Sequence, residues 1–144
     1  MLKRRLVFLC MGAVIASASM VLAETVPLTP GHYDVMVSGM PGGGSESRDR
    51  CVTAEHLVDP EGVFAYAFVR KYEPLPGRKV LNYSAQGGKI SYDVETSMAM
   101  THVEGTASSS EFSVVRDTKS KSGKGMPMTM KLDGKRAGKC RKHE

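Results

Sequence analysis

From Lys79 onward, short runs of alternating apolar and polar residues are separated by glycine, serine and other turn-forming residues. Alternation with a period of two is typical of strands that bury one face. The runs 80–85 and 90–95 flank Gly87-Gly88, a pair that favours a tight hairpin turn. The side chains expected on the buried face of this hairpin are Leu81, Tyr83, Ala85, Ile90, Tyr92 and Val94.

Further strands are expected at 33–37, 101–105, 112–118 and 126–132. In the last of these, one face is expected to carry Met126, Met128, Met130 and Leu132. Consecutive strands with such short connections cannot pair in parallel, because a parallel pair needs a crossover of about a dozen residues or more. We therefore predict a mainly β domain, an antiparallel meander of about six strands that forms an open barrel or a strongly curved sheet. A two-sheet sandwich is the alternative.

One short helical segment is expected after the first strand. Thr53 is a suitable N-cap for a helix over 54–58. Asp59-Pro60-Glu61 then supplies a second cap, a first-position proline and an acidic first turn. The apolar face of this second helix would comprise Val63, Phe64, Ala67 and Phe68.

The first 23 residues have the three-part order of a secretory signal. Three basic residues at 3–5 precede an apolar run at 6–15, and small residues lead to a cleavage site after Ala23. Export by the general secretory route is expected, with an uncleaved membrane anchor as the alternative. Cleavage would leave 24–144 as a single β-rich domain with a basic C-terminal tail and no transmembrane segment.

Removal of the signal also removes Cys10, which leaves Cys51 and Cys140 as the two remaining cysteines. An even number of cysteines in an exported domain indicates a disulfide, which would close a loop worth on the order of 4 kcal/mol. A catalytic thiol or a pair of metal ligands is the alternative, but neither cysteine has a second cysteine at the spacing of a metal site.

Charge is distributed unevenly along the chain. The net charge is +5, and the basic residues are concentrated after residue 115, where ten Lys or Arg face three acidic residues. This tail could contact an anionic envelope surface, although a solvated face is the commoner explanation. Nucleic acid is not expected, since the aromatic residues of single-strand binders are missing. The candidate surface residues are Lys131, Lys135, Arg136, Lys139, Arg141 and Lys142.

Methionines recur at strand spacing, and soft thioether ligands suit Cu(I). The candidate ligands are Met98, Met100, His102, Met126, Met128 and Met130. Packing in an irregular core is the simpler interpretation, because methionine adapts to such cores. No cofactor is therefore expected, with Cu(I) as the alternative.

Two histidines have a carboxylate two positions away on the same strand face, His32 with Asp34 and His102 with Glu104. Neighbours on one strand face interact without any catalytic role. An enzyme site would need a nucleophile or a metal that converges on them, and the sequence contains no such constellation. No catalytic residue is predicted.

The order of motifs resembles a family of bacterial periplasmic proteins known as domain of unknown function 3617. Three segments carry the resemblance: Pro-Gly-His-Tyr-Asp-Val at 30–35, Cys-Val-Thr-Ala-Glu-His-Leu at 51–57, and Gly-Lys-Arg-Ala-Gly-Lys-Cys at 134–140. Members usually show Pro-Gly-x-aromatic-Glu-Val, Cys-Leu-Thr-Pro-Glu and Gly-Arg-x-Gly-Asp-Cys at these places. The resemblance implies a periplasmic location and no established activity.

Two departures from the family pattern are informative. The two inner cysteines of the family, expected near 78–79 and 95–96, are absent together, which supports a bond between Cys51 and Cys140. Lys139 replaces the usual aspartate before the last cysteine. The expected function is that of an exported, non-enzymatic binding or accessory protein for a small apolar ligand or an envelope component. A periplasmic Cu(I)-binding protein and a hydrolase are the alternatives.

Overall fold

A computed structural model describes residues 25–65 and 77–142, and they form one antiparallel sheet of seven strands in the order β2-β1-β7-β6-β5-β4-β3. The strands are β1 (Gly31–Ser38), β2 (Ser45–Val52), β3 (Lys79–Gln86), β4 (Lys89–Glu95), β5 (Ala99–Ala107), β6 (Glu111–Ser120) and β7 (Met128–Gly138). The sheet is not closed, since β2 and β3 are its two edges. The predicted mainly β meander is confirmed.

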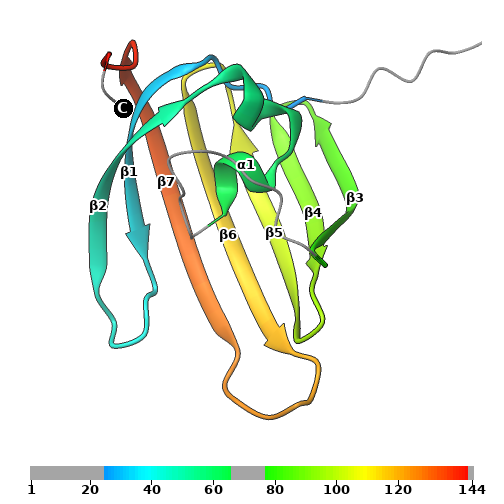
Figure 1. Cartoon of the computed structure of the whole chain (residues 1–144). Helices are drawn as coiled ribbons and strands as arrows, with labels where there is room; N and C mark the ends of the chain where they lie inside the picture. The colour runs from blue at the N-terminus through cyan, green and yellow to red at the C-terminus, as the bar shows by residue number, and fades with distance from the viewer. Residues whose placement is uncertain (1–24, 66–76, 143–144) are drawn as a thin grey trace, which may run out of the picture.

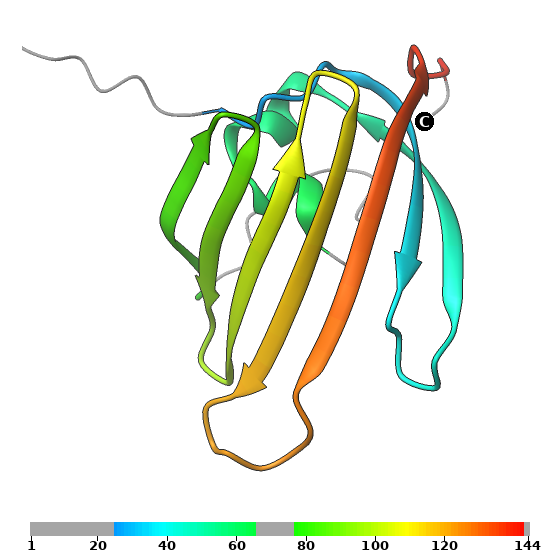
Figure 2. The same ribbon diagram turned by 180° about the vertical axis from the view of Figure 1, so that it is seen from behind.

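The sheet is strongly curved, and its two faces differ (Figure 1). A 3-10 helix, η1 (Ala54–Val58), and one α-helical turn, α1 (Glu61–Phe64), lie against the inner face. The view from behind shows the outer face without a helix over it (Figure 2). We refer to η1 and α1 together as the cover.

The apolar core lies between the inner face and the cover. The alternation in β4 is as predicted, with Ile90, Tyr92 and Val94 buried. The ring of Phe64 in α1 packs edge-on against Phe112 of β6 with centroids 5.2 Å apart. The other buried residues of this core are Val26, Leu28, Tyr33, Val35, Val37, Val52, Val63, Val103, Ala107, Val114 and Leu132.

Strand β2 is the element that the sequence pattern did not predict. Its inward-facing residues are Glu46, Arg48, Arg50 and Val52, which pair across from Val37, Val35, Tyr33 and Gly31. Most of this face is charged, so the run lacks the apolar alternation of a half-buried strand. Charged side chains are common on edge strands because they discourage pairing with another chain.

The hairpin of β3 and β4 has the predicted turn, with positive φ at Gly87 (59°) and Gly88 (78°). The predicted face of β3 is wrong at one residue. The register shifts between Leu81 and Ser84, and Asn82 has a φ of 56°. This bulge reverses the alternation, so that Leu81 is exposed while Tyr83 packs against the core.

The last strand starts later than the methionine spacing predicts. Strand β7 begins at Met128, and Met126 lies in the preceding loop with 95% of its surface exposed. Met126 therefore does not share the inner face with Met130 and Leu132, which are buried. The strand continues to Gly138.

The cover forms largely where the capping residues predict it. Asp59 Oδ1 accepts a hydrogen bond from the backbone N–H of Glu61 at 2.9 Å, which fixes the start of α1. Val63 and Phe64 are buried as expected. Ala67 and Phe68 lie outside the described residues.

Gly134 in β7 leaves the space that the ring of Phe112 occupies, and the two residues pair directly across the strands. We expect Gly134→Ala to destabilise the fold by about 1–3 kcal/mol, because the added methyl group would clash with this buried ring. Urea unfolding checks the value. Gly44→Ala is the matched control: its nearest neighbour is 4.0 Å away, and a glycine-to-alanine change without strain is neutral or mildly stabilising. Equal effects of the two changes would contradict the prediction.

Candidate functional site

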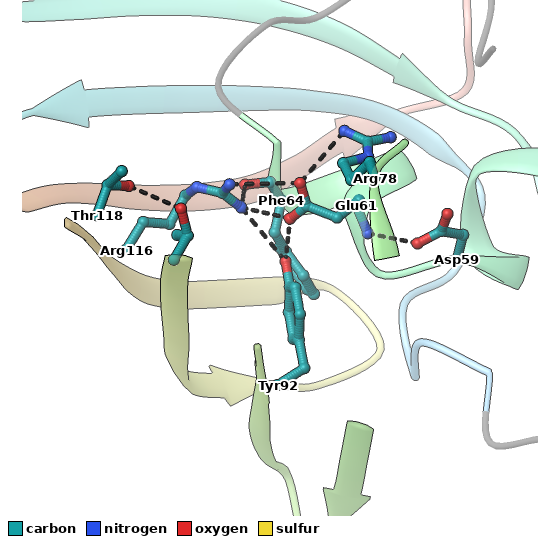
Figure 3. A network of polar contacts seen from close by, with 8 residues as sticks. Asp59, Glu61, Phe64, Arg78, Tyr92, Arg116 and Thr118 are labelled. Carbon is teal, nitrogen blue, oxygen red and sulfur yellow. Dashed lines mark hydrogen bonds and ion pairs between the residues drawn. The ribbon is translucent and has the colours of Figure 1, made fainter. Parts of the chain in front are cut away.

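A buried carboxylate lies at the centre of the inner face. Glu61 of α1 is 3% exposed and contacts residues from two strands of the sheet (Figure 3). Its Oε1 accepts hydrogen bonds from the hydroxyl of Tyr92 in β4 at 2.8 Å and from Nη1 of Arg116 in β6 at 2.5 Å. Its Oε2 accepts from Nη2 of Arg116 and from Nη1 of Arg78, both at 3.3 Å. We call these four residues the Glu61 network.

Arg116 also joins the sheet to the backbone of the cover, because its Nη1 donates to the carbonyl of Phe64 at 2.8 Å. Burial alone would lower the pKa of Arg116, but the hydrogen bond and the negative charge of Glu61 outweigh it and raise this pKa. Burial raises the pKa of Tyr92 well above its ordinary value, and the charge of Glu61 adds to that shift. Arg116 is therefore a cation and Tyr92 a neutral donor.

The geometry of the Glu61 network suits a structural role. Both oxygens of Glu61 are occupied by donors from Arg116, Tyr92 and Arg78. A carboxylate with all its acceptor positions engaged is a poor general base, since a base must reach the proton it removes. The network instead holds α1 against β4 and β6.

The sequence pattern contains only a weak indication of this network. Glu61 is predicted only as an acidic first-turn residue, and Arg116 is one of the ten basic residues after residue 115. The indication lies in the position of Arg116, which follows Phe112 and Val114 on the apolar side of their strand. A lone charge on the buried side of a strand indicates a buried partner, since burying an unpaired charge is very costly.

The structure places the candidate copper ligands on different faces of the sheet. Met130 is buried on the inner face, opposite Arg116, whereas Met100 and His102 are exposed on β5. Met98 is 77% exposed in the turn before β5. Met128, at the start of β7, is partly buried. The six candidates therefore do not converge on one point.

His102 lies in a row of polar residues on the outer face. Its Nδ1 is 2.7 Å from Oδ1 of Asp93, and its Nε2 is 3.7 Å from a carboxylate oxygen of Glu104, as the predicted pair requires. The Nδ2 of Asn82 donates to Oδ2 of Asp93 at 3.0 Å. The hydrogen bond to Asp93 is the largest cause of a raised pKa at His102, and burial opposes it.

We expect Asp93→Asn to lower the pKa of His102 toward its ordinary value, because the substitution removes the carboxylate that stabilises the imidazolium. An NMR titration of the imidazole protons measures this shift. Since the folded-state pKa is raised, the interaction stabilises the fold below the ordinary pKa and is lost as pH rises through the raised one. The effect on stability should be small, because the His102 side chain is 47% exposed. An unchanged His102 titration would contradict the assignment.

The second predicted pair also forms, and a third residue joins it. His32 Nε2 is 3.6 Å from Oδ1 of Asp34 in β1. Asp49 of β2 lies directly opposite Asp34. One ligand atom from each of these three residues lies within 4.8 Å of the others. The sequence could not reveal Asp49, because its strand was not predicted.

Several of the candidate surface residues have partners within the domain. Arg136 donates from Nε and Nη2 to the carbonyl of Pro30. Lys131 is 3.0 Å from Asp133, and Lys135 is 3.8 Å from Glu111. The side chains of Lys139, Arg141 and Lys142, near the end of the described residues, are exposed.

The predicted disulfide joins Cys51 of β2 to Cys140, which follows β7. In the sheet, β1 lies between β2 and β7, and His32 of β1 pairs with Cys51 on one side and Gly138 on the other. The Cα atoms of the two cysteines are 5.2 Å apart, so the segment that follows β7 reaches the edge strand β2 directly and is tied to it by the bond.

Comparison with known proteins gives no relative. No protein-family model, no curated protein and no solved structure matches this chain. Within residues 25–65 and 77–142, no helix has the length and apolar character needed to cross a membrane.

Proposed function

We propose that the protein is an exported, non-enzymatic binding or accessory protein that holds a small apolar ligand on the inner side of its open sheet. The signal pattern at 1–23, and the resemblance of the motif order to domain of unknown function 3617, support export to the periplasm. The observation that carries the proposal is the incomplete burial of apolar side chains along one edge of an open sheet.

That edge is β3. Val80, Tyr83 and Ala85 face the core from β3 but are only partly buried, as is Leu57 on the cover. Apolar surface of this kind attracts an apolar ligand, because burial stabilises by roughly 25 cal/mol per Å² removed from water. Such a ligand would enter between β3 and the cover and leave the Glu61 network in place.

Fluorescence of the apolar probe N-phenyl-1-naphthylamine tests this proposal. We expect saturable binding to the purified, oxidised protein, and mass spectrometry of solvent extracts should find an apolar compound that co-purifies. Ala85→Trp would fill the inner side of β3 and weaken probe binding. Val115→Trp introduces the same side chain at a partly buried position of β6 that alternates with buried Val114 and Arg116, and should leave binding unchanged.

Circular dichroism would establish that both tryptophan variants fold. Absence of saturable probe binding, or equal weakening by Ala85→Trp and Val115→Trp, would overturn the proposed inner site.

A further inference from the structure

We propose that His32, Asp34 and Asp49 form a binding site for a divalent transition-metal ion of the Zn²⁺ class. The site lies on the outer face of the β1–β2 hairpin. It is separate from the proposed apolar site, which lies on the inner side of β3.

The hairpin register brings the three side chains together. His32 and Asp34 are two positions apart in β1, so their side chains share a face. Asp49 pairs with Asp34 across the strands. Burial holds His32 in place, since its side chain is 8% exposed, whereas the Asp34 side chain is 62% exposed and accessible to an ion.

The distances suit a bound ion. Nε2 of His32 and Oδ1 of Asp34 are 3.6 Å apart, which is longer than an ordinary N–H···O hydrogen bond of about 2.7–3.2 Å. Two ligands of a tetrahedral ion with bonds of about 2.0–2.1 Å are separated by roughly 3.4 Å. All three ligand atoms lie within 4.8 Å of one another, so small side-chain rotations would bring them to one ion.

The electrostatics also favour a cation. Asp34 and Asp49 are directly opposite each other, and like charges at such positions are destabilising. Lys135 of β7 faces Asp34 from the other side, but its Nζ lies 3.8 Å from Glu111. Cys51, which faces His32, is engaged in the disulfide and is not a thiolate ligand.

The donor set selects the class of ion. One imidazole nitrogen with two carboxylate oxygens suits Zn²⁺ and related borderline ions, whereas Mg²⁺ prefers oxygen ligands alone and Cu(I) prefers sulfur. Three protein ligands would leave a coordination position for water. Asp34 and Asp49 are both exposed, which gives this position access to solvent.

Isothermal titration of the purified, oxidised protein with Zn²⁺, without a polyhistidine tag, tests the proposal. We expect one ion per chain with a micromolar or tighter dissociation constant, and much weaker binding of Mg²⁺. Asp49→Asn should weaken Zn²⁺ binding by at least about tenfold, since it removes a ligand. His32→Gln should abolish it.

His102→Gln is the matched control, because His102 is also an outer-face histidine beside carboxylates. We expect this variant to bind Zn²⁺ as the unmodified protein does. Asp49 is exposed on an edge strand, so Asp49→Asn remains informative even where His32→Gln fails to fold. No binding below about 100 μM, unchanged affinity in Asp49→Asn, or loss of affinity in His102→Gln would each overturn the site. A negative result here leaves probe binding at the inner site unaffected, so the two proposals fail independently.

Discussion

Replacement of both bonded cysteines, Cys51→Ser with Cys140→Ser, is expected to lower the free energy of unfolding by about 4 kcal/mol. The bond joins residues 89 positions apart, and the unfolded chain gains conformational freedom when a loop of that size is opened. Small domains have total stabilities of about 5–15 kcal/mol, so this loss is a large fraction of the whole. Urea unfolding of the oxidised protein and of the double variant measures the difference.

The unmodified protein under reducing conditions is the control for this prediction. It should lose nearly the same free energy as the double variant, because in both cases only the covalent link is removed. The edge strand β2 depends on the link most directly, since its ladder partner in the sheet is β1 alone. Hydrogen exchange should therefore increase first in β2. A double variant as stable as the oxidised protein would show that the bond contributes nothing to the fold.

Local patterns were sufficient for the elements whose two faces differ in polarity. Ile90, Tyr92 and Val94 alternate with polar neighbours, and the glycine pair before them adopts the positive φ that such a turn requires. These signals depend on neighbouring residues only. They determine strand positions and, through the short connections, the antiparallel order.

The same reasoning failed where tertiary context decides the structure. Strand β2 has charged residues on its inward side, so only its pairing with β1 defines it. The bulge at Asn82 reverses the alternation of β3 in a way that no period of two can express. The methionine spacing extends back to Met126, two residues before β7 begins at Met128. In β2 and β3, pairing with the neighbouring strand overrides the local pattern.

The candidate sites also divide into contacts that a local pattern predicts and contacts that only the fold creates. The pairs His32 with Asp34 and His102 with Glu104 were predictable, because their residues are two positions apart on one strand. Asp49 joins the first pair only through the hairpin register. The Glu61 network unites residues that are up to 55 positions apart, so it follows from the fold and not from the sequence pattern.

Glu61→Ala is expected to lower the free energy of unfolding by about 3–5 kcal/mol, because it leaves buried Arg116 without its counter-charge. Arg116 is 8% exposed, and Tyr92 is fully buried, so water cannot replace the lost carboxylate. A double change, Glu61→Leu with Arg116→Met, should recover much of this loss, since apolar residues of similar volume often replace a buried ion pair at little cost. Urea unfolding of the single and double variants gives the coupling between the two residues.

The exposed ion pair between Lys121 and Glu95 supplies the comparison that isolates burial. Its atoms are 2.7 Å apart, nearly as close as those of the buried pair, but both side chains are more than a third exposed. Lys121→Ala should therefore cost less than about 1 kcal/mol. If Glu61→Ala cost no more than Lys121→Ala, or if the losses at Glu61 and Arg116 were simply additive, the network would not fasten the cover to the sheet. If Glu61 holds α1 against β4 and β6, Glu61→Ala must cause a large loss of stability, and the changes at Glu61 and Arg116 must be non-additive.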